Sequence, residues 1–214
     1  MAKQLNIVII GGTACGPKAA ARARRLDQAA KITIIEQREN LSSAICGLPY
    51  FLSGAVKEGD LVARQADYFR NIFDMTVLTG TKAVSVKPRE HTVEVMELKT
   101  EKLATLEYNK LVIATGATPF VPNWEGKELK GIFTLNNIPD AMAISNYIRG
   151  NNVKSAVIVG AGLVGLEAAE NLIEMGLKVT VLEALGWPRP ALFDYEVTVQ
   201  IEGKLKEKGV NILC

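Results

Sequence analysis

Three glycines near the end of the chain have the spacing of a turn that holds phosphate. Gly160-x-Gly162-x-x-Gly165 follows an apolar run and precedes a segment rich in helix formers. Glycines at these positions let the backbone approach a pyrophosphate, and the N–H groups at the start of the following helix meet its charge. Glu183 closes the next apolar run, where a carboxylate can accept hydrogen bonds from ribose hydroxyls.

A second turn of this kind lies near the start of the chain. Gly11 and Gly16 hold the first and third glycine positions, Thr13 holds the second, and Glu36 closes the following apolar run. The layout of strand, turn, helix, strand and acid predicts another nucleotide site. From the residues alone, the alternative for this first turn is a strand-helix-strand unit that binds no ligand.

One cysteine lies between the two turns. Cys46 is part of the segment Ser42-Ser43-Ala44-Ile45-Cys46-Gly47-Leu48-Pro49-Tyr50. The other two, Cys15 and Cys214, are far from it and no C-x-x-C pair occurs, so neither a disulfide framework nor a zinc site is indicated. His91 is the only histidine, and a lone imidazole does not make a metal site. Any reactive thiol therefore acts singly, and the alternative for Cys46 is a buried, inert cysteine.

The elements that would position these residues follow from apolar runs and turn residues. Longer strands are predicted over residues 5–10, 32–35, 110–114, 155–159, 178–182 and 210–213, and short ones over 77–78, 83–86, 93–98 and 103–108. Helices are predicted over 19–26, 59–74, 140–149, 166–175 and 194–208. The order predicts an α/β fold of two Rossmann-like, three-layer domains, over 1–120 and 121–214. We expect the short strands to form a β-rich insertion in the first domain, and the second domain to be truncated.

Composition excludes several classes of protein. The 214 residues are 48% hydrophobic and 22% charged with a net charge of +2, which is typical of a globular chain and gives no electrostatic reason to bind nucleic acid or a membrane. The first residues lead directly into a short apolar strand, too short for a signal segment or a membrane helix. A cytoplasmic location is therefore predicted.

Two such turns in one chain, the first with a β-rich insertion and a lone cysteine, resemble the flavin-dependent pyridine nucleotide-disulfide oxidoreductases over the entire chain. The Cys46 segment, together with Ala19–Asp27, is similar to the single-cysteine branch of that family. This branch contains coenzyme A-disulfide reductases, persulfide and polysulfide reductases, NADH oxidases and NADH peroxidases. The chain departs from the branch at Ile45, where asparagine is usual, and at Leu163, where an aromatic residue is frequent.

The resemblance implies FAD at the first turn, in a domain over 1–120 without its C-terminal return segment, and NADH at the second, in an incomplete domain over 121–214. Glu183 disfavours NADPH because its charge repels a 2′-phosphate. The implied FAD contacts are Gly11, Gly12, Thr13, Ala14, Gly16, Glu36, Ala114, Thr115 and Gly116. The implied NADH contacts are Gly160, Gly162, Leu163, Val164, Gly165, Glu167 and Glu183.

The resemblance also implies a redox role for Cys46 and substrate contacts by Arg22, Arg25 and Ser42. Ala14 occupies a position where oxidases and peroxidases commonly have histidine, which favours a sulfur substrate. From the residues alone, Arg22 and Arg25 form a solvated helix face, and Glu167 is equally well explained as a carboxylate on a helix surface.

The implied activity passes electrons from NADH through FAD to Cys46, which reduces a small disulfide, persulfide or polysulfide; a coenzyme A-based thiol is one candidate substrate. The full-length protein is expected to be a homodimer, and no metal is expected. Two alternatives stay open. One is an NADH oxidase or peroxidase, and the other is a non-catalytic, truncated nucleotide-binding fragment.

Overall fold

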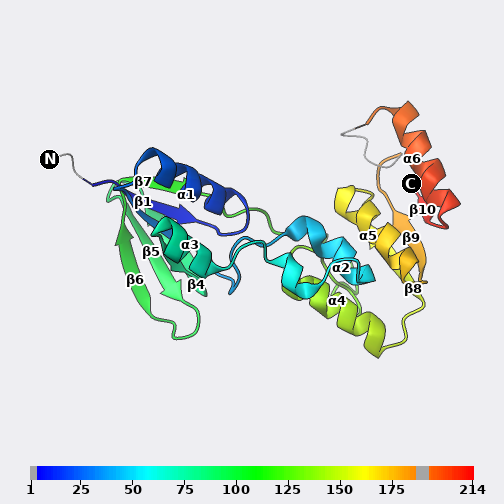
Figure 1. Ribbon diagram of the computed structural model, residues 1–214. Coiled ribbons are helices and arrows are strands. Elements are labelled where there is room, and N and C mark those ends of the chain that lie inside the picture. The colour runs from blue at the N-terminus through cyan, green and yellow to red at the C-terminus, as the bar shows by residue number, and fades with distance from the viewer. Residues whose placement is uncertain (1–3, 187–192) are drawn as a thin grey trace. The chain divides into compact units, whose positions relative to one another are not determined.

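The computed structural model of the chain (Figure 1) describes residues 4–186 and 193–214. The chain divides into two compact units. The first comprises Met1–Ala44 and Val62–Thr118, and the second comprises Ile45–Leu61 and Pro119–Cys214. Residues 45–61, which we expected in the first domain, therefore belong with the second unit.

A parallel sheet forms the centre of the first unit. Its strand order is β3-β2-β1-β7, with β1 over Asn6–Ile10, β2 over Lys31–Ile35, β3 over Thr76–Leu78 and β7 over Lys110–Ile113. A separate antiparallel sheet has the order β4-β5-β6, over Thr81–Lys87, Thr92–Glu97 and Leu103–Glu107. The helices of this unit are α1 (Cys15–Leu26) and α3 (Ala66–Phe73).

The apolar run of β1 is buried on both faces, which is why its residues do not alternate with polar ones. Ile9 packs with Ala20 of α1 and Phe69 of α3. Val8 and Ile10 point the other way and pack in a cluster with Val93 and Val95 of β5. Figure 1 shows α1 and the β4–β6 sheet on opposite sides of β1. The expected three-layer unit with its β-rich insertion is confirmed.

Two predictions in this unit are corrected. Residues 77–78 were assigned to the β-rich insertion, but they lie in β3, which pairs in parallel with β2 and so extends the main sheet. The helix predicted over 59–74 is only half present, because α3 begins at Ala66. Val62 forms an isolated bridge with Ser43, and the Ala63 N–H donates to the Ser42 carbonyl at 3.0 Å, so this stretch is extended.

The second unit is built on a three-stranded parallel sheet of order β10-β9-β8. Its strands are β8 (Ser155–Val159), β9 (Lys178–Leu182) and β10 (Asn211–Leu213). Its helices are α2 (Leu48–Ser53), α4 (Ile138–Gly150), α5 (Leu163–Glu174) and α6 (Tyr195–Glu207), with 3₁₀ turns over Ile45–Gly47 and Glu58–Leu61. The strands over 155–159 and 178–182 match the prediction residue for residue, and α5 begins three residues earlier than predicted.

Helix α2 explains why residues 45–61 belong to this unit. Leu48 and Leu52 are buried, and α2 packs on both α4 and α5. Leu61, which ends the segment, is also fully buried. A six-residue helix is too short to be stable alone, so these contacts hold it in place.

Candidate nucleotide and thiol sites

The first glycine turn closes against the end of β7. Gly11 has a φ of +109°, and a Cβ added there would lie 2.0 Å from the Ala114 carbonyl oxygen. A Cβ on Gly16 would lie 1.8 Å from the Gly11 oxygen. Both positions therefore accept only glycine. The Ala114 N–H donates to the Ile10 carbonyl at 2.7 Å, which fixes Ala114 beside the turn, and Thr115 follows directly.

Glu36 anchors this turn from the end of β2. Its Oε2 accepts a hydrogen bond from the Gly12 N–H at 2.7 Å, and its Oε1 accepts one from the Arg38 N–H at 2.9 Å. The residue is 4% exposed. Each carboxylate oxygen has two lone pairs, so acceptor capacity remains for a ribose hydroxyl. Glu36 therefore holds the turn in shape, and its contact with a ribose stays a prediction.

The second turn repeats this bonding. Glu183 Oε2 accepts from the Ala161 N–H at 2.8 Å and Oε1 accepts from the Leu185 N–H at 3.0 Å. A Cβ on Gly165 would lie 2.2 Å from the Gly160 oxygen, so this glycine is also required. Gly162 caps the start of α5.

Further predicted contacts of the second turn lie at the start of α5. Leu163 and Val164 are more than half exposed, at 54% and 51%. Glu167 is half-buried one turn further along the helix. The structure thus brings the predicted residues of this turn, Gly160 to Glu167 and Glu183, to one end of the β10-β9-β8 sheet.

Three predicted substrate residues lie in the first unit. Ser42 has a φ of +55°, and its N–H donates to the Gly12 carbonyl at 2.7 Å, so its backbone is fastened to the glycine turn. Arg22 and Arg25 are exposed on α1. The structure therefore joins Ser42 to the first turn and leaves both guanidinium groups at the surface.

Arg24, between these two arginines, has a role that the sequence did not reveal. Its Nε donates to the Phe73 carbonyl and its Nη2 to the Asp74 carbonyl, at 2.8 and 2.6 Å. Its Nη1 donates to the carbonyls of Gln28 and Ala30 at 2.7 and 2.6 Å. Arg24 thus joins the end of α1 to the end of α3 and is a structural residue.

Cys46 lies with the second glycine turn in the same unit. It is exposed within the 3₁₀ turn Ile45–Gly47, directly before α2. Cys15 and Cys214 are also exposed. Although Cys214 is exposed, the protein atoms beside its thiol remove part of its solvation and raise its pKa, and the negative charges of Glu202 and Glu183 raise the pKa further. Cys214 therefore forms thiolate less readily than an ordinary cysteine does.

A comparison with known protein families identifies the family of this chain. The family model described as pyridine nucleotide-disulphide oxidoreductase matches residues 5–214. The chain belongs to this family.

Three known proteins are similar to this chain over most of its length. A coenzyme A disulfide reductase of Staphylococcus haemolyticus is 37% identical over 83% of this chain and 40% of its own. An NADH oxidase of Methanocaldococcus jannaschii is 30% identical over 98% of this chain and 47% of its own. The structure of an NAD-dependent persulfide reductase from A. fulgidus matches with a TM-score of 0.91 and 40% identity, over 98% of this chain and 39% of its own. The chain thus spans less than half the length of these relatives.

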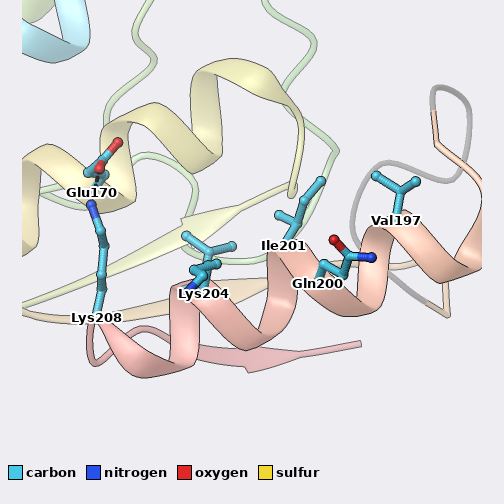
Figure 2. A pocket seen from close by; sticks show the side chains of 7 residues that line it. Glu170, Val197, Gln200, Ile201, Lys204 and Lys208 are labelled. Carbon is cyan, nitrogen blue, oxygen red and sulfur yellow. Dashed lines mark hydrogen bonds and ion pairs between the residues drawn. The ribbon is translucent and has the colours of Figure 1, made fainter.

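Two shallow cavities lie away from the predicted site residues. One, of about 430 Å³, runs between α5 and α6 (Figure 2) and is lined by Glu170, Val197, Gln200, Ile201, Lys204, Leu205 and Lys208. In Figure 2 the Lys208 side chain points toward Glu170; their hydrogen bond raises the pKa of Lys208. The other, of about 450 Å³, lies in the first unit and is lined by Gln4, Asn6, Glu90, His91, Glu107, Tyr108 and Asn109.

No group of three or more His, Cys, Asp or Glu side chains within residues 4–186 and 193–214 could hold a metal ion. No helix in these two ranges is long and apolar enough to cross a membrane.

Proposed function

We propose that this oxidoreductase chain binds FAD at the first glycine turn and NADH at the second, and passes electrons to Cys46. Cys46 then reduces a small disulfide, persulfide or polysulfide. The observation that carries the proposal is the repeated bond between a glycine turn and an acid, Gly12 to Glu36 and Ala161 to Glu183, in a chain with an exposed thiol at Cys46. The disulfide and persulfide reductases among its relatives support this choice of substrate.

The residues present fit two dinucleotides. At Gly11, Gly16 and Gly165 a Cβ would collide with backbone oxygens, so each turn is as tight as close approach to a pyrophosphate requires. We assign Gly11, Gly12, Thr13, Ala14, Gly16, Glu36, Ala114, Thr115 and Gly116 to FAD. We assign Gly160, Gly162, Leu163, Val164, Gly165, Glu167 and Glu183 to NADH. The chemistry that these groups supply when bound is hydride transfer followed by transfer of an electron pair to sulfur.

The choice of NADH rests on Glu183. Its carboxylate is fixed by two backbone N–H groups at the end of β9, where the ribose of a bound dinucleotide lies in such turns. A free 2′-hydroxyl can donate to this carboxylate, whereas a 2′-phosphate would be repelled by it. We therefore propose that NADPH binds more weakly than NADH.

The proposed reaction at Cys46 needs an external sulfur partner. The Cys46 thiolate attacks one sulfur of R–S–S–R, so that a bond from Sγ to that sulfur forms, the S–S bond breaks and RS⁻ leaves and takes up a proton. An electron pair derived from NADH then cleaves the mixed disulfide. The overall change is R–S–S–R + NADH + H⁺ → 2 RSH + NAD⁺. In this proposal Arg22, Arg25 and Ser42 bind R, the group that carries the substrate sulfur. If R contains phosphates, as coenzyme A does, these suit the two guanidinium groups.

The test is Cys46→Ser in the flavin-loaded protein, with Cys15→Ser as the matched control. The Cys46 variant should keep its flavin and the bleaching of that flavin by NADH, and lose disulfide turnover by about 1,000-fold or more. The Cys15 variant should keep turnover. Wild-type turnover in Cys46→Ser would refute the role of this thiol.

An NADH oxidase is the second candidate, because the Methanocaldococcus jannaschii relative carries that name and an exposed Cys46 thiol can be oxidised to a sulfenic acid. Oxygen uptake with NADH in the absence of any disulfide would favour it. A purified chain without flavin absorbance would instead favour the non-catalytic fragment. The homodimer and the cytoplasmic location stay predictions, and sedimentation of the loaded protein tests the first.

A further inference from the structure

Asn171 is the most completely buried polar side chain of α5. It is 2% exposed, and the neighbouring side chains of Ala168, Ala169 and Leu172 are also buried. An amide in such a place is costly unless both of its polar atoms are bonded. The reason for an asparagine here must therefore lie in its partners.

Both polar atoms of Asn171 are bonded. Its Nδ2 donates to the Glu167 backbone carbonyl at 2.8 Å, and its Oδ1 accepts from the Ser53 hydroxyl at 2.6 Å. A carbonyl can only accept and the hydroxyl can donate, so this amide orientation avoids the contact between two oxygens that the opposite one would create. The second bond joins residues that are 118 positions apart in the sequence.

Ser53 is the last residue of α2, the helix that directly follows the Cys46 turn. Leu48 and Leu52 also hold α2 in place, but their apolar contacts define the position of the helix less narrowly than a hydrogen bond does. Asn171 lies on α5, whose first residues carry the second glycine turn. The contact between Ser53 and Asn171 is thus a directional link between the thiol segment and the proposed nucleotide helix within one unit.

We propose that Asn171 is a positioning residue that holds the Cys46 segment in place on α5. It sets the position of the thiol through Ser53 and α2, without touching substrate or cofactor. The proposal rests on the proposed function only for its effect on turnover. The link itself can be tested without any activity.

The first measurement is hydrogen exchange of the backbone amides of residues 47–54, followed by peptide mass spectrometry on the full chain. Ser53→Ala and Asn171→Leu should each speed this exchange by about 3- to 10-fold, because each removes the hydrogen bond between these residues from a short helix. Ser53→Ala also removes the contact of the hydroxyl with the Tyr50 carbonyl at 3.1 Å, whereas Asn171→Leu keeps it. Ser53→Thr keeps the hydroxyl and should restore the wild-type rate.

The matched control is Asn151→Ala. Asn151 Nδ2 donates to the Tyr147 carbonyl at 2.9 Å, the same bond to the fourth preceding residue that Asn171 makes to Glu167, but Asn151 is exposed at the end of α4. This variant should leave exchange in residues 47–54 unchanged. If Ser53→Ala and Asn171→Leu also leave it unchanged, the link does not position the segment and the proposal fails.

The second measurement separates positioning from mere stability in the flavin-loaded protein. Asn171→Leu and Ser53→Ala should lower kcat for coenzyme A disulfide by about 10-fold or more, because small displacements of a reacting group are costly. KM for NADH and the rate of flavin bleaching by NADH should not change. Equal losses in bleaching and turnover, or faster exchange with unchanged kcat, would each refute a positioning role. Failure of the proposed function would instead show as wild-type protein without turnover, with the exchange result intact.

Discussion

The two glycine turns are built by the same hydrogen bonds but closed to different extents. In each, the backbone N–H after the first glycine donates to an acid at the end of the next strand, at 2.7 Å to Glu36 and 2.8 Å to Glu183. The N–H groups of these acids donate in turn to the last residues of the third strands, Leu78 and Leu213. Strands β3-β2-β1 and β10-β9-β8 therefore correspond one to one.

The difference lies on the other side of the first strand. In the first unit β7 pairs with β1 and places Ala114 against Gly11. In the described part of the second unit no strand pairs with β8 on that side; Val157 and Val159 are 63% and 59% exposed, and a Cβ on Gly160 would meet nothing within 4 Å. The bond between turn and acid is thus local to each strand-helix-strand unit, whereas closure of the turn needs a fourth strand from elsewhere in the sequence.

The largest expected effect is the difference in destabilisation between Gly11→Ala in the first turn and Gly160→Ala in the second. Both positions have a positive φ, of +109° and +102°, so each alanine carries backbone strain of about 1–2 kcal/mol. Only the first also collides with a backbone carbonyl, which adds about 1–3 kcal/mol. We expect a loss of roughly 2–5 kcal/mol for Gly11→Ala and of about 1–2 kcal/mol for Gly160→Ala, measured as the free energy of opening of each unit by hydrogen exchange in urea.

The third glycines provide the control for this pair. Gly16→Ala and Gly165→Ala would both bring a Cβ within 2.2 Å of a backbone oxygen of the same turn, so their losses should be similar. If Gly160→Ala were as costly as Gly11→Ala, the second turn would be as closed as the first and the proposed difference would be wrong.

A smaller effect is expected from the two acids. Glu36→Ala leaves the Gly12 N–H without its acceptor in a buried place, which should cost about 2 kcal/mol, because an unsatisfied buried donor loses its solvation. Glu183 is only half-buried, so water can replace its carboxylate and the cost should stay below about 1 kcal/mol. Urea unfolding of each variant, followed unit by unit, measures the difference.

The exposed acid Glu39 supplies the control, since its removal tests charge alone. Glu39→Ala should leave the free energy of unfolding nearly unchanged. Equal costs for Glu36→Ala and Glu183→Ala would mean that exposure does not determine the strength of the bond between turn and acid.

These contrasts also show what the sequence could reveal. Glycine spacing and apolar runs gave β8, β9 and both acids, because strand, turn and acid are neighbours in the chain and their pattern is local. Closure of Gly11 by Ala114 depends on the pairing of β1 with β7, which are about a hundred residues apart in the sequence. Glycine spacing carries no information about such a pairing. Over residues 59–74 a local pattern predicted too long a helix. Val62 pairs with Ser43 in a bridge, so α3 begins only at Ala66.

The thiol segment shows the same limit. The single Cys46 was visible in the sequence, but its membership of the second unit depends on Leu48 and Leu52 of α2, the helix that packs on α4 and α5. Asn171 did leave a signal, as a polar residue among apolar ones on a helix face. Its partner Ser53 left none, because a serine at the end of a helix is ordinary.

The smallest expected effect concerns Cys214, which directly follows β10 near the acid of the second turn, at the place where the first unit has Thr79. Its pKa is raised first by partial burial and then by Glu202 and Glu183, so its thiol stays protonated to higher pH than an ordinary cysteine. Glu183→Gln removes one negative charge and should move the pH midpoint of Cys214 alkylation by iodoacetamide downward. The midpoint should stay above that of a cysteine peptide, because the larger cause, burial, remains.

Peptide mass spectrometry reads Cys15 in the same sample, and its profile should not move. An unchanged Cys214 midpoint would show that the Glu183 carboxylate does not act on this thiol. The two N–H groups that donate to the carboxylate, of Ala161 and Leu185, would then compensate its charge.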